Sequence, residues 1–407
     1  MNVKDKAIAI VRKLVRQGFI AYFAGGWVRD YLMGHPSYDI DIATNASPAE
    51  ILDLFPCTIP VGLSFGVVIV VYEGHNFEVS TFRRDIAYSN GRQPERIEQS
   101  SPEEDAIRRD FTINGMFYDP LEDNLYDYVN GREDIQKGII RAIGNPSERF
   151  FEDRLRMVRA VRFAARFGFH IDLETQEGII AYAANLFPAV AMERIWQEFT
   201  KMASSPRFDQ AILDLHKLGL LGVIFPQLKH LHLHDLRHIV AVYHHFPLGT
   251  PTILYLIELF PHAKVEELRD VCNYLRISGQ DTKLMEFVHT HRTHGIPTDK
   301  VSLAHFYAHF HSQLCLQVTA AKLHKSEKES FLKLHGAQEK SLAQHVQRLV
   351  EKKPLVHGSL LKEHGIPEGK RMGFLLKEAE RLIITHDLED PSEVIALLTK
   401  SPNWKPT

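Results

Sequence analysis

The sequence has little of what marks several protein classes. Its three cysteines, Cys57, Cys272 and Cys315, lie far apart and form no CxxC pair. Neither a zinc site nor a disulfide framework is therefore indicated, and a reducing, cytoplasmic compartment fits. No apolar run approaches the length that spans a membrane. The formal net charge is −3, so a nucleic-acid partner would have to be bound by a local basic patch. We expect neither a membrane nor a DNA partner.

Common nucleotide-binding signatures are also missing. The chain has neither a GxGxxG loop nor a Walker A motif. Histidine is abundant, with 23 residues, and is concentrated at 232–238 and 289–294, but we interpret these side chains as solvated or core residues rather than metal ligands. The basic, amphipathic N-terminus leaves a transit peptide open, although Asp5 and the helical spacing of its apolar residues favour a first helix of the fold.

The chain length of 407 residues exceeds one compact core and suggests at least two domains. Up to about residue 145, helix and strand signals alternate, which predicts a small domain of mixed structure. The expected helices cover 4–17, 27–34 and 48–55, the last with a capping box of Ser47 and Glu50, and the expected strands cover 19–26, 38–44, 66–74 and 76–82. From about residue 146 the spacing is helical almost throughout, and 147–169 reads as helical along its whole length.

The segment YDIDIAT, residues 38–44, places two aspartates one residue apart in a predicted strand. Because side chains alternate along a strand, Asp39 and Asp41 share one face while Ile40 and Ile42 point into the core. Cα atoms at this spacing lie roughly 6–7 Å apart, so the carboxylates can converge on two cations roughly 3.5–4 Å apart. Oxygen ligands suit Mg²⁺ or Mn²⁺. A half-exposed strand with solvated acids is the alternative.

The segment GGWVRD, residues 25–30, lies shortly before these acids. Gly25 and Gly26 follow a strand and open a helix, so the backbone can approach an anion closely and helix N–H groups can face phosphate. Arg29 adds a charged fork. A glycine pair alone indicates only a tight turn, but its place before an acidic strand favours phosphate binding.

A third acid and a basic segment extend the pattern. Glu78, on the next predicted strand, is the candidate third acid, with a solvated glutamate as the alternative. In residues 103–116, Arg108 and Arg109 are suited to neutralise a triphosphate. Asp110 is suited to accept a hydrogen bond from a ribose hydroxyl. A surface salt-bridge cluster is the alternative.

The predicted helix after residue 152 carries a basic stripe. Four arginines fall within a sector of roughly 120°: Arg156, Arg159, Arg162 and Arg166. They repel one another unless anions or acids lie opposite, and Glu152 and Asp153 stand in register with them. This favours a binding face over a solvated basic face.

Together these elements resemble the class II, bacterial and eukaryotic branch of the tRNA nucleotidyltransferase and poly(A) polymerase family, within the polymerase β-like superfamily. The matching stretches cover about residues 20–200: GGWVRD…DID, RRDFTINGM, YDYVNGREDI…IIRAIGNP and EDRLRMVRAVRFAARFGF. Residues 355–383 also resemble the family's C-terminal segment. The resemblance implies an α+β polymerase β-like nucleotidyltransferase head followed by an all-α neck, body and tail. The expected boundaries are 1–145 for the catalytic head, 146–205 for the base-recognising neck, 206–353 for the body and 354–407 for the tRNA-binding tail.

The resemblance also implies roles for single residues. Asp39 and Asp41 look like Mg²⁺ ligands. Glu78, expected from the strand pattern rather than from the resemblance, completes the expected catalytic set. The expected nucleotide-binding residues are Gly25, Gly26, Arg29, Arg109, Asp110, Asp153, Arg156, Arg159 and Arg162. Among these, Asp153 and Arg156 look like the family's amino-acid template for the incoming base. Residues 189–199 resemble the family's last motif, with Arg194 in place, but we interpret them as a structural helix.

The template agrees with the chemistry of the bases. Cytosine and adenine each present an amino donor and a ring-nitrogen acceptor on the pairing edge, whereas guanine and uracil present the reverse polarity. A carboxylate accepts and a guanidinium donates, so Asp153 with Arg156 matches C and A. A mismatched base would leave buried polar groups unpaired, which provides discrimination.

The expected activity is template-independent addition of CCA, or its terminal A, to the tRNA 3′ end from CTP and ATP with two Mg²⁺ ions, or Mn²⁺ in their place. Residues 83–96 fall where the family has a flexible loop, which looks shortened in enzymes limited to CC, and it is not short here. The stretch VGLSFGVVIVV looks more like the CCA-adding group than like poly(A) polymerases. Poly(A) polymerase and a non-catalytic RNA-binding relative remain the alternatives.

Overall fold

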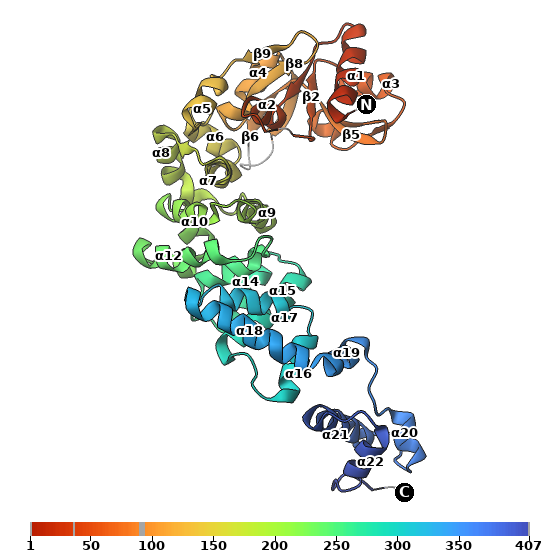
Figure 1. Cartoon of the computed structure of the whole chain (residues 1–407). Coiled ribbons are helices and arrows are strands. Elements are labelled where there is room, and N and C mark those ends of the chain that lie inside the picture. The colour runs from red at the N-terminus through yellow and green to blue at the C-terminus, as the bar shows by residue number, and fades with distance from the viewer. Residues whose placement is uncertain (1, 36, 89–93, 406–407) are drawn as a thin grey trace. The chain divides into compact units, whose positions relative to one another are not determined.

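The computed structural model describes residues 2–35, 37–88 and 94–405. The chain divides into two compact units, Met1–Ala241 and Val242–Thr407. The strands of the large sheet belong to the first unit, and helices make up the second (Figure 1). The fold class is therefore the expected one, an α+β head followed by helices. The finer division into head, neck, body and tail stays a prediction.

The first unit contains every strand that the structure assigns. These are β1 (Ala21–Ala24), β2 (Asp41–Thr44), β3 (Thr58–Ile59), β4 (Val67–Tyr72), β5 (His75–Thr81), β6 (Arg83–Tyr88), β7 (Pro94–Gln99), β8 (Met116–Asp119), β9 (Asn124–Asp127), β10 (Ile139–Ile140) and β11 (His170–Ile171). Its helices are α1 (Val3–Arg16), α2 (Gly26–Leu32), α3 (Pro48–Leu54), α4 (Pro102–Ile107), α5 (Gly131–Lys137), α6 (Pro146–Glu152), α7 (Leu155–Phe167), α8 (Leu173–Tyr182), α9 (Met192–Ala203), α10 (Phe208–Lys217), α11 (Leu220–Ile224) and α12 (Leu233–Val240). A 3₁₀ turn, η2, covers Thr112–Asn114.

A seven-stranded mixed sheet, in the order β3-β4-β5-β2-β1-β8-β9, forms the centre of this unit. β2 runs parallel to β5, with Ile42 opposite Val79. β1 runs antiparallel to both β2 and β8. The carboxyl end of β1 therefore lies beside the amino end of β2, and the expected phosphate turn and acidic segment meet at one edge.

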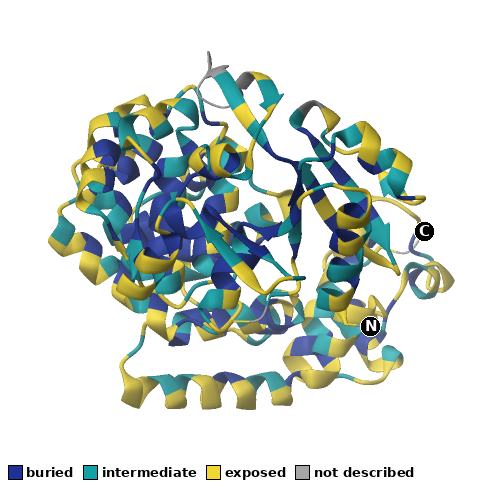
Figure 2. Cartoon of the chain, turned by 90° about the horizontal axis from the view of Figure 1, so that it is seen from above, coloured by how far each residue is buried: buried dark blue, intermediate teal, exposed yellow. Residues whose placement is uncertain are grey.

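The two faces of the sheet differ in how they are covered. One face packs under α1, α2 and α3, and its core includes Ile10, Phe23, Ile42 and Val79. The other face carries a smaller cluster that includes Ala24, Ala43 and Phe117. In Figure 2 the buried parts are central strand segments and the inward sides of helices.

The second unit is helical. Its helices are α13 (Thr252–Leu256), α14 (Val265–Tyr274), α15 (Gly279–His294), α16 (Lys300–Ala308), α17 (Ser312–Ala320), α18 (Lys325–Ser341), α19 (Ala343–Glu351), α20 (Gly358–Glu363), α21 (Lys370–His386) and α22 (Pro391–Leu398). Leu361, Leu375, Val394 and Leu398 form a separate small core around the last three helices. Within the described ranges of the chain, no helix is long and apolar enough to cross a membrane.

Most of the expected elements of the first unit are confirmed. The first helix, the strand before the glycine pair and the two strands around Gly74 lie where the sequence places them. The capping box at α3 is also present: the Ser47 hydroxyl accepts from the Glu50 N–H, and the Glu50 carboxylate accepts from the Ser47 N–H at 2.7 Å. Capping residues and the periodicity of apolar residues in the sequence were sufficient to predict these elements.

The strand expected over residues 38–44 is shorter than predicted. It begins at Asp41, because its partner β1 ends at Ala24, the residue opposite Asp41, where the chain turns into α2. Asp39 lies before the strand in a local turn, in which its N–H donates to the Ser37 hydroxyl at 3.3 Å. The expectation that one strand contains both aspartates is therefore wrong, although Ile40 and Ile42 are buried as expected.

The helix expected from residue 147 onward is broken. α6 ends at Glu152 and α7 begins at Leu155, with Asp153 extended between them at φ −140° and ψ 104°. The Asp153 carboxylate accepts from the Leu155 N–H at 3.1 Å, and its own N–H donates to the Arg149 carbonyl. This local capping competes with a continuous helix.

Residues 83–96 include strand β6 and the first residues of strand β7. β6 and β7 form an antiparallel hairpin, with Arg83 opposite Gln99. Residues 83–88 and 94–96, expected in the flexible loop, are therefore strand, and residues 89–93 lie outside the described residues.

We expect Gly131→Ala to destabilise the first unit. An added Cβ would lie 2.2 Å from the carbonyl oxygen of Thr112, a backbone atom that cannot move aside easily. Overpacking of this kind costs about 1–3 kcal/mol, so thermal denaturation should show a lower transition temperature. Gly336→Ala is the control: it lies in α18 with open space around it, and it should be neutral or stabilising by about 0.5–1 kcal/mol. Equal transition temperatures for Gly131→Ala and the unmodified protein would contradict this packing.

Candidate active site

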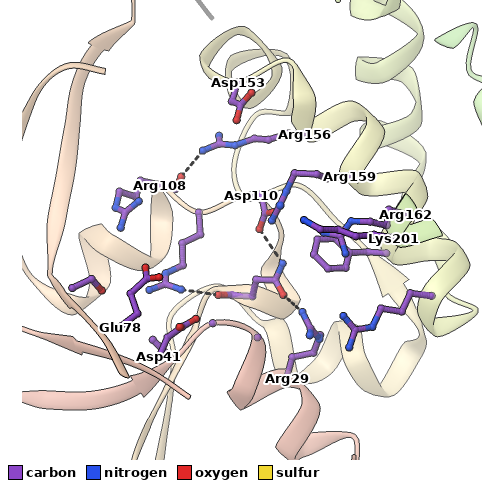
Figure 3. A pocket seen from close by; sticks show the side chains of 18 of the residues that line it. Arg29, Asp41, Glu78, Arg108, Asp110, Asp153, Arg156, Arg159, Arg162 and Lys201 are labelled. Carbon is purple, nitrogen blue, oxygen red and sulfur yellow. Dashed lines mark hydrogen bonds and ion pairs between the residues drawn. The ribbon is translucent and has the colours of Figure 1, made fainter. Parts of the chain in front are cut away.

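A cavity of about 910 Å³ opens between the less covered sheet face and helices α7 and α9 of the first unit. Figure 3 shows its charged side chains pointing toward a common space from both sides. Of the site residues expected from the sequence, the structure brings together Gly25, Gly26, Arg29, Asp41, Glu78, Arg109, Asp110, Asp153, Arg156, Arg159 and Arg162. Asp39 is the one expected residue that does not line this cavity.

Two carboxylates lie side by side on the sheet. Ile42 pairs with Val79 in the parallel β2–β5 ladder, and Asp41 and Glu78 come one position earlier on their strands. Both side chains therefore face the cavity (Figure 3). The expectation that the third acid comes from a neighbouring strand agrees with this placement, while its catalytic role stays a prediction.

The environment of Asp41 disfavours its charged form. Burial, then the negative charges of Glu78 and Asp39, raise the pKa of Asp41 to about 7, although Arg109 acts in the opposite direction. Burial and Asp39 likewise raise the pKa of Glu78. Three carboxylates thus sense one another across this edge of the sheet.

The donor chemistry fits a hard divalent cation. All three groups offer oxygen ligands, and a cation would relieve the repulsion and desolvation that raise the Asp41 pKa. Across the part of the chain that the structure describes, no group of three or more His, Cys, Asp or Glu side chains is already close enough to hold a metal. The acids would have to draw together around the ion.

A chain of hydrogen bonds runs across the floor of the cavity. Arg29 donates to Asp30 at 2.8 Å and to the Asn114 side-chain oxygen at 2.6 Å. Asn114 donates to Asp110 at 3.0 Å, and Arg159 donates to the other Asp110 oxygen at 2.9 and 2.6 Å. Burial would raise the pKa of Asp110, but Arg159 and the Asn114 hydrogen bond outweigh it and hold that pKa below its usual range.

A second buried acid holds the two arginines after α4. Arg108 donates to one oxygen of Asp105 at 2.6 Å, and Arg109 donates to the other at 3.0 Å. Gly25 lies next to Arg109: its φ is +63°, and a Cβ there would lie 3.1 Å from the Arg109 guanidinium. The turn thus needs glycine both for its backbone angle and for this approach.

The expected base template is positioned by further ion pairs. Asp153 accepts from Arg194 at 2.8 and 3.3 Å, and Arg156 donates to Glu152 at 2.7 Å and to the Arg108 carbonyl at 2.9 Å. A carboxylate has about four acceptor positions, so Asp153 can accept from a base as well as from Arg194. Interpreting residues 189–199 only as a structural helix was therefore incomplete.

Helix α9 supplies groups that the sequence analysis did not assign to the site. Arg194, Glu198 and Lys201 recur at the spacing of one helix face. Arg194 contacts Asp153, Glu198 pairs with Arg162, and Lys201 lines the cavity. The spacing of these charged residues along the helix was the signal from which their place in the site could have been predicted.

The cavity has a surplus of positive charge. Nine arginine or lysine side chains line it, against the four acids Asp41, Glu78, Asp110 and Asp153. Arg83, Arg108 and Arg166 line the cavity in addition to the arginines of the expected nucleotide-binding set. Walls of one sign concentrate ligands of the opposite sign, so the cavity is suited to a polyanion such as a nucleoside triphosphate.

Comparisons with known proteins agree with this geometry. Residues 21–141 match the poly A polymerase head domain, and residues 168–231 match a domain described as the probable RNA and SrmB-binding site of polymerase A. These matches cover the sheet-bearing part of the first unit and helices that follow it.

More specific relatives are CCA-adding enzymes. The enzyme of Ligilactobacillus salivarius is 31% identical over 97% of this chain and 96% of that protein. That of Geobacillus thermodenitrificans is 44% identical over 53% of each chain, so this match spans about half the length of the relative. The solved structure of the Bacillus stearothermophilus CCA-adding enzyme in complex with CTP covers 98% of both chains with a TM-score of 0.79 and 26% identity. The chain belongs to the CCA-adding enzyme family.

We expect Asp41→Asn to stabilise the protein in the absence of divalent ions at pH 8. The folded-state pKa of about 7 exceeds the ordinary 3.8, so between these pH values the folded protein retains a proton that the unfolded chain has released, and at pH 8 the buried carboxylate is charged. The Asp41 contribution to stability therefore falls as pH rises from about 4 to about 7. Thermal melts in a chelator should show a higher transition temperature for the variant at pH 8 and a smaller gain at pH 5. A gain of equal size at both pH values would contradict this electrostatic account.

Proposed function

We propose that this protein is a template-independent RNA nucleotidyltransferase that adds CCA, or its terminal A, to the 3′ end of tRNA from CTP and ATP. The observation that carries the proposal is one cavity in which Asp41 and Glu78 face a surplus of cations, with Asp153 and Arg156 in the same wall. The names of the relatives support the same activity. We place the reaction in the cytoplasm.

In the reaction, the RNA 3′-oxygen attacks the α-phosphorus of the nucleotide. A new phosphodiester bond forms, the bond between the α-phosphorus and the bridging oxygen breaks, and pyrophosphate leaves with its electron pair. Arg29 and Arg109 lie nearest the glycine turn and bind the phosphates. Asp110, kept ionised by Arg159, accepts from a ribose hydroxyl.

Two Mg²⁺ ions, or Mn²⁺ in their place, held by Asp39 and Asp41 would supply charge neutralisation and activation of the 3′-hydroxyl. Glu78 adds negative charge beside Asp41 and would help to hold the same cations. The arginines then orient the triphosphate so that the pyrophosphate points away from the attacking oxygen.

Selection of C and A falls to Asp153 and Arg156. Arg194 and Glu152 fix both side chains in place before a base arrives. Such prior positioning lowers the cost of forming hydrogen bonds with the correct base. Guanine or uracil would meet an acceptor with an acceptor and a donor with a donor.

An incorporation assay tests the function. Purified protein with Mg²⁺ should receive labelled CTP, ATP or both, with tRNA transcripts that end at the discriminator base, in C or in CC, and with an unstructured RNA. We expect CCA on the shortest tRNA and a stop after the terminal A. Asp39→Ala and Asp41→Ala should each abolish addition while circular dichroism stays unchanged.

Other outcomes identify the alternatives. Addition of A to the CC-ending tRNA alone would define an A-adding enzyme. Long A tails on the unstructured RNA would indicate a poly(A) polymerase. Retained activity in either aspartate variant would refute the carboxylate assignment, and RNA binding without any addition would indicate a non-catalytic relative.

Asp153→Asn should relax base selection. The amide still accepts from the Leu155 N–H, so the junction between α6 and α7 is kept, but it also donates, which admits uracil. Loss of a hydrogen bond from a charged acceptor should lower the ratio of kcat/KM for CTP over UTP by about tenfold to a hundredfold. Asp214→Asn, on α10 outside the cavity, is the matched control. An unchanged ratio in Asp153→Asn would rule out this residue as a base contact.

A further inference from the structure

Helix α12, the last helix of the first unit (Figure 1), carries two exposed histidines, His234 and His238, four residues apart. Leu236 and Val240 are the buried residues of this helix and face the core. At the angular spacing of an α-helix, both histidines fall on the opposite side. The fold therefore presents two imidazole rings to solvent, one above the other on a single helix turn.

The two rings point toward each other. The Nε2 atom of His238 lies 3.1 Å from the Nε2 atom of His234, and the ring planes are 75° apart. Bonds from imidazole nitrogen to zinc are about 2.0–2.1 Å long, so two Nε2 atoms 3.1 Å apart subtend an angle of roughly 100° at an ion bonded to both. This angle lies between the octahedral and the tetrahedral values. The pair thus has the spacing of a two-point metal chelate.

The protonation chemistry of the pair is compatible with an ion. Without an ion, one ring donates its Nε2 proton to the Nε2 lone pair of the other. With both protons at Nδ1, both Nε2 lone pairs are free to bind a metal, and the exposed Nδ1–H groups can donate to water. Among the described residues, neither imidazole makes a hydrogen bond to any further protein group. An ion would therefore displace one hydrogen bond and no ion pair.

Sequence spacing alone does not create this arrangement. His305, on α16, and His309, its C-cap, are also four residues apart. There, however, the His305 Nε2 atom bonds to the Glu380 carboxylate at 2.9 Å, and the His309 ring stacks on Phe287 with centroids 3.8 Å apart. The α12 pair keeps its facing nitrogens for each other. This pair is therefore the exception among the histidines of residues 232–238, which we otherwise interpret as solvated.

We propose that His234 and His238 form a binding site for a late first-row divalent ion, Zn²⁺ in particular. Imidazole suits Zn²⁺, whereas Mg²⁺ prefers carboxylate and water oxygens, so this site differs in chemistry from the acids around Asp41. The protein supplies two ligands, because no group of three or more His, Cys, Asp or Glu side chains comes together in the part of the chain that the structure describes. Water completes the coordination shell. The site is independent of the proposed function.

The ion would hold one turn of α12 in helical geometry. The helix has eight residues, and its N-cap, His232, makes no side-chain capping hydrogen bond. Helices this short are marginal on their own. The two ligands come together only when the turn between them is helical, so binding stabilises the folded turn by mass action. Zn²⁺ should therefore suppress local opening of α12, which immediately precedes the second unit in the sequence.

Hydrogen exchange with mass spectrometry tests the site in the full chain. Exchange is followed in peptides that cover residues 233–240, in a buffer that contains Mg²⁺, with and without added Zn²⁺. We expect Zn²⁺ to slow the exchange of α12 amides and Mg²⁺ alone to leave it unchanged. His238→Ala should remove this protection. In calorimetric titrations with Zn²⁺, the same variant should weaken one site by at least about tenfold, since even outer partners of a metal contribute that much.

Matched variants complete the test. His234→Ala should reproduce His238→Ala. His386→Ala removes another exposed helix histidine, at the end of α21, and should keep the full Zn²⁺ effect. Alanine favours helix more than histidine does, so α12 stays folded in the variants, and the readout is the Zn²⁺-dependent difference in exchange. No Zn²⁺ effect on α12 in the unmodified protein, or an equal effect in His238→Ala, would overturn the site.

Discussion

The ion pair between Asp110 and Arg159 is the interaction on which the rest of the site depends. Asp110 is 9% exposed and precedes η2 of the sheet-bearing region, while Arg159 lies on α7. A buried carboxylate is costly unless it is paired and hydrogen-bonded. Asp110 meets this condition only with α7 in place, and Asn114 extends the constraint to Arg29. Sheet, turn and helix are therefore fixed relative to one another by one charged group.

Around this fixed point the site uses two kinds of recognition. Cations such as Arg108 and Arg109 supply attraction without directional selectivity, and buried Asp105 holds them at the edge of the sheet. Asp153 instead has an orientation fixed by Arg194. Attraction brings any nucleoside triphosphate to the cavity, whereas the oriented carboxylate distinguishes among bases. Salt weakens the attraction by the cations. It does not weaken the selection by Asp153, since that selection depends on desolvated hydrogen bonds.

How far sequence reasoning succeeded depends on the range of the interactions. The capping box at Ser47 and the burial of Ile42 are set by residues within a few positions, and both were predictable. The residue at which β2 begins was not predictable, because it is decided by where the partner strand β1 ends, at Ala24. The pairing of Asp153 with Arg194 joins residues 41 positions apart, so its strength depends on tertiary packing. The structure brings the expected site residues together in one cavity, except Asp39, and their roles stay predictions.

Asp153 has two roles at the break between α6 and α7. Its carboxylate faces the cavity, and the same carboxylate holds the N–H that opens α7. A residue that serves both the helix junction and the pairing edge cannot be exchanged freely for another base reader, since most replacements would also release the start of α7. The choice of nucleotide alphabet is thereby tied to the backbone path. A change of terminal sequence through any residue that cannot accept from the Leu155 N–H would require a new junction as well as a new side chain.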